Sequence, residues 1–424
     1  MNLYRLKKYK KVVNNYTNIL IVYIFSKRSG GFMNTIEKVK QVEDYIVKCR
    51  RDLHQIPEIG FDLPKTSKYV ASELKKMGIE IHENVGVSGI VGLIKGSKDG
   101  KTIALRADMD ALPIKEETGL KFASTNGNMH ACGHDTHTAM LLGAAKILSE
   151  NRNEIHGNVK LIFQPAEESP GGAKPMLNDG AFENPKVDAV FGIHGGNLYQ
   201  GARKGTIIVC PGNMMASLDR FKLKLIGKGC HGAYPQTGVD PIVMTGYFLS
   251  ATQSILSREI SATDSAVITI GKINGGNAYN VVPDYVELEG TVRAGDQKVR
   301  ENISKRLEGI AKGISEAMRG SYELDYTFGY PPLVNNKKFT EEFIKSAKKV
   351  MPEEDIKIVN KAVMGSEDFA YYLEEVPGTF IFLNNQREVD GVCHPNHNSK
   401  FDIEESLLSR GTALIVQTAL DYLG

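Results

Sequence analysis

A short segment, residues 130–137, holds a thiol, three imidazoles and a carboxylate. Cys132 and His134 stand two positions apart, so both can face one metal ion from a loop, and thiolate with imidazole suits transition metals. A structural zinc site would add a second cysteine pair at short spacing, but the other four cysteines are isolated from one another. The remaining ligands must therefore come from distant segments. The alternative is that Cys132 is a small buried apolar residue and that the histidines cap a helix.

Further side chains of this kind follow predicted strands. The strands and the residues after them are 102–106 with Asp108 and Asp110, 158–163 with Glu167 and Glu168, and 189–193 with His194. Open α/β sheets collect ligand-binding residues at the carboxyl ends of their strands. An acidic pair in a loop is by itself most often a solvated turn. Beside so many other ligand types, we expect Glu168 to bind metal and Glu167 to act as a general base toward a water.

The expected roles of the other histidines and of the aspartates differ with their sequence surroundings. Near the C-terminus, either His394 or His397 is expected to complete the ligand set. Asp110 is expected to orient an imidazole, whereas Asp108 fits either a ligand or a supporting role. His137, one helical turn after His134, is expected to support the site. No special role is predicted for three histidines, namely His54, His82 and His156.

The elements that position these residues indicate two domains. The length of 424 residues agrees, because it is too long for one compact core. Helices and strands alternate over residues 33–215 and again over 329–424, which predicts an α/β catalytic domain with a mixed sheet. Between them, residues 216–328 follow a β-α-β-β-α-β order, which is the ferredoxin-like arrangement. We therefore expect a catalytic domain in two parts, interrupted by a small inserted domain.

Composition limits the partners and the compartment. The net charge of +2 arises from 52 basic and 50 acidic residues, so neither nucleic acid nor a membrane is an expected partner. Five scattered cysteines favour a reducing compartment, and hence the cytoplasm. Residues 1–32 combine a basic start with a short apolar centre, as in a signal peptide, but no small-residue cleavage site follows. We expect this segment to be a poorly ordered extension upstream of the functional start.

Several motifs together resemble the amidohydrolase branch of the aminoacylase and carboxypeptidase superfamily, which includes hippurate hydrolases, indoleacetyl-amino acid hydrolases and N-acetyldiaminopimelate deacetylases. They are His-Ala-Cys-Gly-His-Asp at 130–135, Arg-Ala-Asp-Met-Asp-Ala-Leu-Pro at 106–113, Gln-Pro-Ala-Glu-Glu at 164–168, Gly-Ile-His-Gly at 192–195, Gly-Lys-Gly-Cys-His-Gly-Ala-Tyr-Pro at 227–235, Gly-Gly-Asn-Ala-Tyr-Asn-Val-Val-Pro at 275–283 and Gly-Ser-Glu-Asp-Phe at 365–369. The resemblance covers residues 34–424 almost without a gap. It implies a di-metal catalytic domain with an inserted lid or dimerisation domain.

The resemblance also implies a role for individual residues. The implied metal ligands are Cys132, His134, Glu168, His194 and His397, the last because Phe401 follows it by four positions. Glu167 is the implied base. In the inserted domain, His231 is similar to a histidine that reaches into the site of a neighbouring protomer, and Asn280 and Arg293 resemble groups that hold substrate. Cys230 departs from the Gly or Ser common in relatives, and this thiol could make the site sensitive to oxidation.

The expected reaction is hydrolysis of the amide bond of an N-acyl amino acid. Two divalent ions, of manganese, zinc, cobalt or nickel, would lower the pKa of a water and polarise the scissile carbonyl. A homodimer or homotetramer formed through the inserted domain is expected. The alternatives are an aminopeptidase, dipeptidase or carboxypeptidase on the same scaffold, and a metal-binding protein without catalysis. The last is disfavoured because pure binding gives no use to Glu167 beside Glu168.

Overall fold

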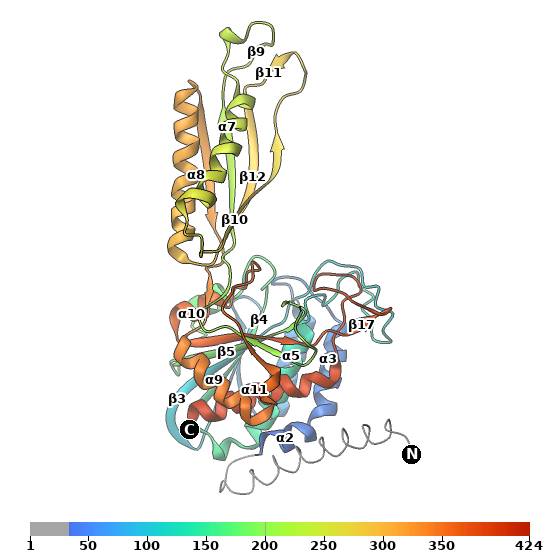
Figure 1. The fold of residues 1–424 in the computed structure, drawn as a ribbon. Helices are drawn as coiled ribbons and strands as arrows, with labels where there is room; N and C mark the ends of the chain where they lie inside the picture. Colours follow the sequence, from blue (N-terminus) through green and yellow to red (C-terminus); the bar gives the residue numbers. More distant parts are fainter. Residues whose placement is uncertain (1–33, 200) are drawn as a thin grey trace, which may run out of the picture.

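The computed structural model describes residues 34–199 and 201–424, and the predicted N-terminal extension lies outside them. A broad α/β part and a slender α/β part make up the molecule, and the slender part projects from one end of the broad one (Figure 1). Both chain segments predicted for the catalytic domain lie in the broad part. The slender part is formed by the middle of the chain.

A mixed sheet of eight strands forms the centre of the broad part, in the order β1-β2-β4-β3-β5-β16-β6-β15. Its strands are β1 (Glu80–Val85), β2 (Gly89–Lys95), β3 (Lys98–Asp108), β4 (His156–Gln164), β5 (Ala189–Gly196), β6 (Ile207–Val209), β15 (Ile356–Ile358) and β16 (Gly378–Asn384). The four central strands β4, β3, β5 and β16 run parallel, while β2 and β6 pair antiparallel to this group. The predicted fold class is confirmed, and the parallel strands bring their carboxyl ends to one edge.

Helices cover the sheet, and α5 is central among them. They are α2 (Thr35–Gln41), α3 (Glu43–His54), α4 (Pro64–Lys76), α5 (His134–Glu150), α6 (Ala173–Asn178), α9 (Lys337–Val350), α10 (Ala370–Glu375) and α11 (Leu408–Leu423). Nearly all of α5 is buried, and α5 contacts α3 and α11. Its alanines and leucines favour a helix and leave no polar face, as expected of a helix surrounded by protein. Gly133, with φ of +89°, caps its first turn, so the helix begins at the predicted ligands.

The slender part is a four-stranded antiparallel sheet in the order β10-β12-β8-β13, with two helices on it. In chain order its elements are β8 (Asp219–Ile226), α7 (Pro241–Ser254), β10 (Ala266–Asn274), β12 (Tyr285–Ala294), α8 (Gln297–Ala317) and β13 (Ser321–Phe328). Along β8 every second residue is buried, because one sheet face packs on the helices and the other faces solvent. Each helix starts at an aspartate, Asp240 or Asp296, whose carboxylate accepts backbone N–H groups of the first turn.

Short elements complete the chain. The remaining strands are β7 (Asn213–Met215), which pairs with β14 (Leu333–Val334), β9 (Cys230–His231), which pairs with β11 (Val281–Val282), and β17 (Glu388–Val389), which pairs with β18 (Val392–Cys393). Single helical turns are η1 (Arg152–Glu154), η2 (Pro235–Thr237), η4 (Glu353–Asp355) and η5 (Glu405–Leu407), and η3 (Ile255–Glu259) is π-helical. Across residues 34–199 and 201–424, no helix combines the length and apolar character needed to cross a membrane.

Candidate active site

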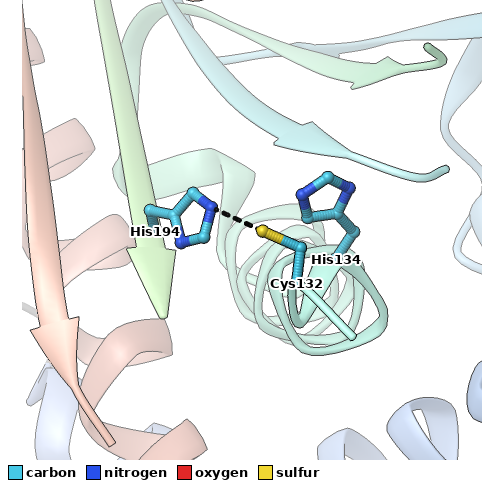
Figure 2. Close-up of side chains that lie close together, drawn as sticks. All are labelled: Cys132, His134 and His194. Carbon is cyan, nitrogen blue, oxygen red and sulfur yellow. Dashed lines mark hydrogen bonds between the residues drawn. The ribbon is translucent and has the colours of Figure 1, made fainter. Parts of the chain in front are cut away.

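Three predicted ligands from separate elements face one another at the carboxyl edge of the sheet. Figure 2 shows Cys132, two residues before α5, and His134, the first residue of α5, close to His194 on β5. The Sγ atom of Cys132 lies 3.4 Å from Nε2 of His194. One donor atom from each of these three buried residues lies within 4.8 Å of the other two. Thiolate and imidazole at this spacing can hold one transition-metal ion.

A second donor group shares Cys132 with the first. Cys132, Glu168 and His397 also have donor atoms within 4.8 Å of one another, and Nε2 of His397 lies 3.0 Å from Oε1 of Glu168. The sulfur therefore lies between two donor groups, as a ligand shared by two ions would. Of the two C-terminal histidines, the structure brings His397 into a donor group; His394 joins none of the groups found in the described chain.

The chemistry of these atoms fits a pair of metal ions. Nε2 of His134 is buried and has no hydrogen-bond partner within the described residues. A buried polar atom left without a partner costs about 1–3 kcal/mol, which a bound cation would offset. Burial and the neighbouring His137 lower the pKa of His194 well below its usual range. The His194 imidazole is therefore neutral, which is the form that binds metal.

Glu167 lies beside the donor groups in a more enclosed position than Glu168. Its Oε2 atom is 4.0 Å from Nε2 of His134. Burial, followed by the negative charges of Glu367 and Glu168, raises the pKa of the Glu167 carboxyl well above its usual range. A carboxylate in such surroundings accepts a proton readily, which is the property that a general base needs.

Hydrogen bonds fix the backbone of the turn that carries Glu167. Asp110 accepts the backbone N–H of Glu167 at 3.0 Å and that of Glu168 at 3.1 Å, and its Oδ1 lies 3.3 Å from Nδ1 of His134. The hydroxyl of Tyr330 donates to the carbonyl of Glu167 at 2.8 Å. Asp110 thus contacts both the turn and an imidazole, while Tyr330, between β13 and β14, links the turn to the chain leaving the slender part.

His137 has both ring nitrogens occupied by protein groups. Nδ1 lies 2.6 Å from Oδ1 of Asp108, and Nε2 accepts the backbone N–H of Gly195 at 2.7 Å. Because no lone pair is left for a metal, this geometry agrees with a supporting position. Asp108 also accepts from Arg106, so it too is engaged by protein groups.

His54, for which no special role was predicted, takes part in the packing beneath the site. His54 is buried on α3, with Nδ1 2.7 Å from Asp135 and Nε2 3.1 Å from Glu116. Arg50, one helical turn earlier, donates from Nε to Asp135 at 3.1 Å. Asp135 follows His134 directly, so α3 anchors the first turn of α5. Spacing along one helix gave no sign of this, because the partners lie more than sixty positions away.

Arg106 is a further residue without a predicted role. It is fully buried on β3 and donates to Asp108, Glu367 and Asp368 at 2.8–3.0 Å. Asp368 in turn accepts the backbone N–H groups of Gly172 and Ala173, which end the turn bearing the two glutamates. The Gly-Ser-Glu-Asp-Phe motif was a visible signal, but its buried arginine partner could be found only from the fold.

Two of the site residues predicted in the inserted domain lie far from this site of the same chain. His231 is exposed on β9 and Asn280 is exposed beside β11, at the tip farthest from the broad part (Figure 1). The structure therefore does not bring these two residues to Glu167 of the same chain. Arg293 lies near the other end of β12, where its pKa is lowered by burial and by the charge of Arg220. Its Nη1 atom is buried without a partner in the described chain.

Comparison with known proteins agrees with this geometry. A family model described as peptidase family M20/M25/M40 matches residues 104–421. The chain is 41% identical over 388 residues to thermostable carboxypeptidase 1 of Saccharolobus solfataricus, covering 89% of this chain and 96% of that protein. It is 38% identical over 392 residues to hippurate hydrolase of Campylobacter jejuni, covering 92% and 100%. A solved structure from Bacillus subtilis, described as a dinuclear metal-binding peptidase of the M20 family, matches with a TM-score of 0.78 and 34% identity, covering 91% and 99%. The chain therefore belongs to peptidase family M20/M25/M40 and is a hydrolase of amide bonds.

Proposed function

We propose that the protein is a metal-dependent amidohydrolase that cleaves N-acyl amino acids, such as acetyl or benzoyl derivatives, into a carboxylate and a free amino acid. The observation that carries the proposal is the position of Glu167, a buried carboxyl beside two donor groups that share one cysteine. The similarity to hippurate hydrolase supports an acyl amino acid as substrate. A protein that only stores metal would have no use for this buried carboxyl.

The donor groups would hold two divalent ions, one with Cys132, His134 and His194 and the other with Cys132, Glu168 and His397. The solved dinuclear relative supports two ions. When bound, such ions supply Lewis acidity, which lowers the pKa of a water and polarises a carbonyl group. Sulfur, nitrogen and oxygen donors together suit manganese, zinc, cobalt or nickel.

Glu167 would move the proton. Its carboxylate takes a proton from the attacking water and returns it to the departing amine nitrogen, a function worth roughly 10²- to 10⁴-fold in rate. The turn around it is held by Asp110 and Tyr330, so the carboxyl keeps its place during both transfers. Its enclosed surroundings limit the access of bulk water that would otherwise compete for the proton.

The inserted domain would supply substrate contacts. We propose that Arg293 binds the carboxylate of the substrate, since a buried guanidinium atom without a partner suits an anion. Asn280 would hold the substrate, and His231 would stabilise the oxyanion that develops at the carbonyl. Because β9 and β11 lie far from the site of their own chain (Figure 1), His231 and Asn280 would act in the site of a partner subunit.

A homodimer formed through the inserted domain, alone or within a tetramer, would place His231 and Asn280 of one subunit in the site of the other. Ile242, Val243 and Tyr247 are exposed on α7, and Val267 and Ile273 are exposed on the edge strand β10. An edge strand beside apolar side chains is a common site of subunit pairing.

We place the domain boundaries at residues 216 and 328. All five cysteines are free, which supports the cytoplasm as the location.

The substrate class is tested with apoenzyme reconstituted in turn with manganese, zinc, cobalt and nickel. Each form is assayed on N-acetyl and N-benzoyl amino acids, on free dipeptides and on blocked peptides with a free C-terminus. Preferential hydrolysis of the acyl amino acids is expected. The carboxypeptidase alternative rests on the similarity to the Saccharolobus enzyme, and preferential release of C-terminal residues from peptides would establish it instead.

A further inference from the structure

Asn396 directly precedes His397 and contacts the segment that carries Cys132. Its Nδ2 atom donates to the carbonyl of Cys132 at 3.2 Å and lies 3.8 Å from the Sγ atom of the same residue. The adjacent backbone N–H of His397 donates to the carbonyl of Ala131 at 2.8 Å. The C-terminal loop is thus fastened to the cysteine loop at two successive residues.

The same side chain also binds the end of β5. The Oδ1 atom of Asn396 accepts the backbone N–H of Asn197 at 3.0 Å, and Nδ2 lies 3.5 Å from the carbonyl of Gly195. Gly196, with φ of +129°, lies against it so closely that an added Cβ would be 2.4 Å from Oδ1. One amide therefore joins the three segments that carry Cys132, His194 and His397.

His397 needs such support because its own conformation is unfavourable. It has φ of +67°, a left-handed conformation that costs a residue other than glycine about 1–3 kcal/mol unless its surroundings hold it. The imidazole is also half exposed, so packing gives it little restraint. The contacts of Asn396 and the His397 backbone fix the loop just before this residue.

We infer that Asn396 is a positioning residue of the metal centre, which orients the Cys132 sulfur by an N–H···S hydrogen bond and sets the distance between the donor groups on α5, β5 and the C-terminal loop. The inference rests on the proposed role of Cys132 and His397 as ligands. An amide N–H directed at a thiolate stabilises the negative charge on sulfur and so reduces electron donation to a metal. Asn396 would then determine both the affinity of the ions and the electronic character of the metal–sulfur bond.

The test compares Asn396→Leu with Asn398→Leu in the full chain. Leucine keeps the branched shape of the asparagine side chain but is somewhat larger and has no polar atoms. Asn398 is the matched control, because it flanks His397 on the other side and its side chain accepts only the backbone N–H of Lys400 among the described residues. Cobalt affinity is measured by calorimetry on the apoenzyme, the thiolate-to-cobalt charge-transfer band by absorption, and the fold by circular dichroism. Asn396→Ala is the second variant, since it introduces no steric conflict if leucine unfolds the protein.

For Asn396→Leu we expect cobalt affinity to fall about 10- to 100-fold, the range typical of groups that support metal ligands. The charge-transfer band should move to longer wavelength, because the sulfur donates more strongly once the N–H is lost. Asn398→Leu should leave both unchanged. Equal affinity and an unmoved band in Asn396→Leu, or equal losses in both variants, would overturn the inference. If the unaltered chain shows no thiolate band, the proposed ligand role of Cys132 fails, and the inference falls with it.

Discussion

Glu167 and Glu168 are neighbours in sequence with different surroundings. Burial and nearby carboxylates raise the pKa of Glu167. Burial is the largest single influence on Glu168 and acts in the same direction, but the hydrogen bond from His397 and the charges of His134 and His397 together outweigh it, so the pKa of Glu168 is lowered. One carboxyl is suited to taking up a proton and the other to staying ionised as a ligand. Two like residues thus acquire two roles from their contacts.

Glu167→Gln separates catalysis from metal binding. The amide keeps the shape of the side chain but cannot accept the proton, so turnover should fall by roughly 10²- to 10⁴-fold. Metal content, measured by atomic emission, should stay at two ions per chain because Glu167 belongs to neither proposed ligand group. Glu183→Gln, at an exposed position, is the control and should retain full activity. Undiminished turnover in Glu167→Gln would remove this residue from the role of base.

Cys132→Ala tests the shared ligand. Because Cys132 belongs to both donor groups, its loss should weaken both ions, and metal content after dialysis should fall well below two per chain. Cys210→Ala is the matched control, since Cys210 is also a free and buried thiol and belongs to neither group. Retention of two ions by Cys132→Ala would exclude the thiolate from the site.

At the scale of single residues, sequence was informative where chemistry is concentrated in short motifs. Cys132, His134 and Glu168 were chosen by type and spacing, and the structure brings their donor atoms together. The supporting positions of His54 and Asn396 could not be predicted from the sequence, because their side chains act through contacts with segments far away in sequence. A histidine on an amphipathic helix carries no local sign of the carboxylates that will enclose it.

At the scale of elements, Arg106 ties the parallel strands to the C-terminal segment. The residue lies on β3, and its partners Glu367 and Asp368 lie just before α10. The group is buried, and Arg106 is the cation that its three carboxyl partners share, so they depend on it for their counter-charge. This is how the last part of the chain is held against the strands that position the site.

Replacing this arginine should destabilise the whole protein. Arg106→Leu leaves buried carboxylates without their counter-charge, and a broken buried pair costs about 3–5 kcal/mol. The free energy of unfolding in urea measures the loss. Arg220→Leu on β8 is the control, because Arg220 is exposed and surface changes usually stay within about 0.5 kcal/mol. Equal stability of Arg106→Leu and Arg220→Leu would contradict the importance of the buried group.

Element types were predictable from periodicity, but their pairing was not. The β-α-β-β-α-β order was visible in the sequence because its strands alternate and its helices have clear ends. In the large sheet, β16 from the C-terminal part lies between β5 and β6. Local patterns contain no information about which distant strand becomes a neighbour, so this order follows only from the packed structure.

At the scale of the molecule, the distance between the two ends of the inserted part determines where the site is completed. Arg293 lies near the junction with the broad part, whereas His231 lies at the far tip (Figure 1). A single chain in this conformation cannot bring both to Glu167. The proposed dimer resolves the difficulty, because the tip of one subunit can reach the site of the other while Arg293 serves its own chain.

Mixing two inactive variants distinguishes this arrangement from a single-chain site. Glu167→Gln and His231→Ala should each be inactive alone. If His231 acts in the partner's site, a mixed dimer contains one site with both changes and one with neither. Random exchange of equal amounts makes half the dimers mixed, so activity should return to about a quarter of the unaltered level. If both residues act within one chain, every site keeps a defect and activity stays absent. As the control, Glu167→Gln mixed with Cys132→Ala should not recover, because both of those residues belong to the same chain's site. The outcome therefore reports which subunit supplies the histidine.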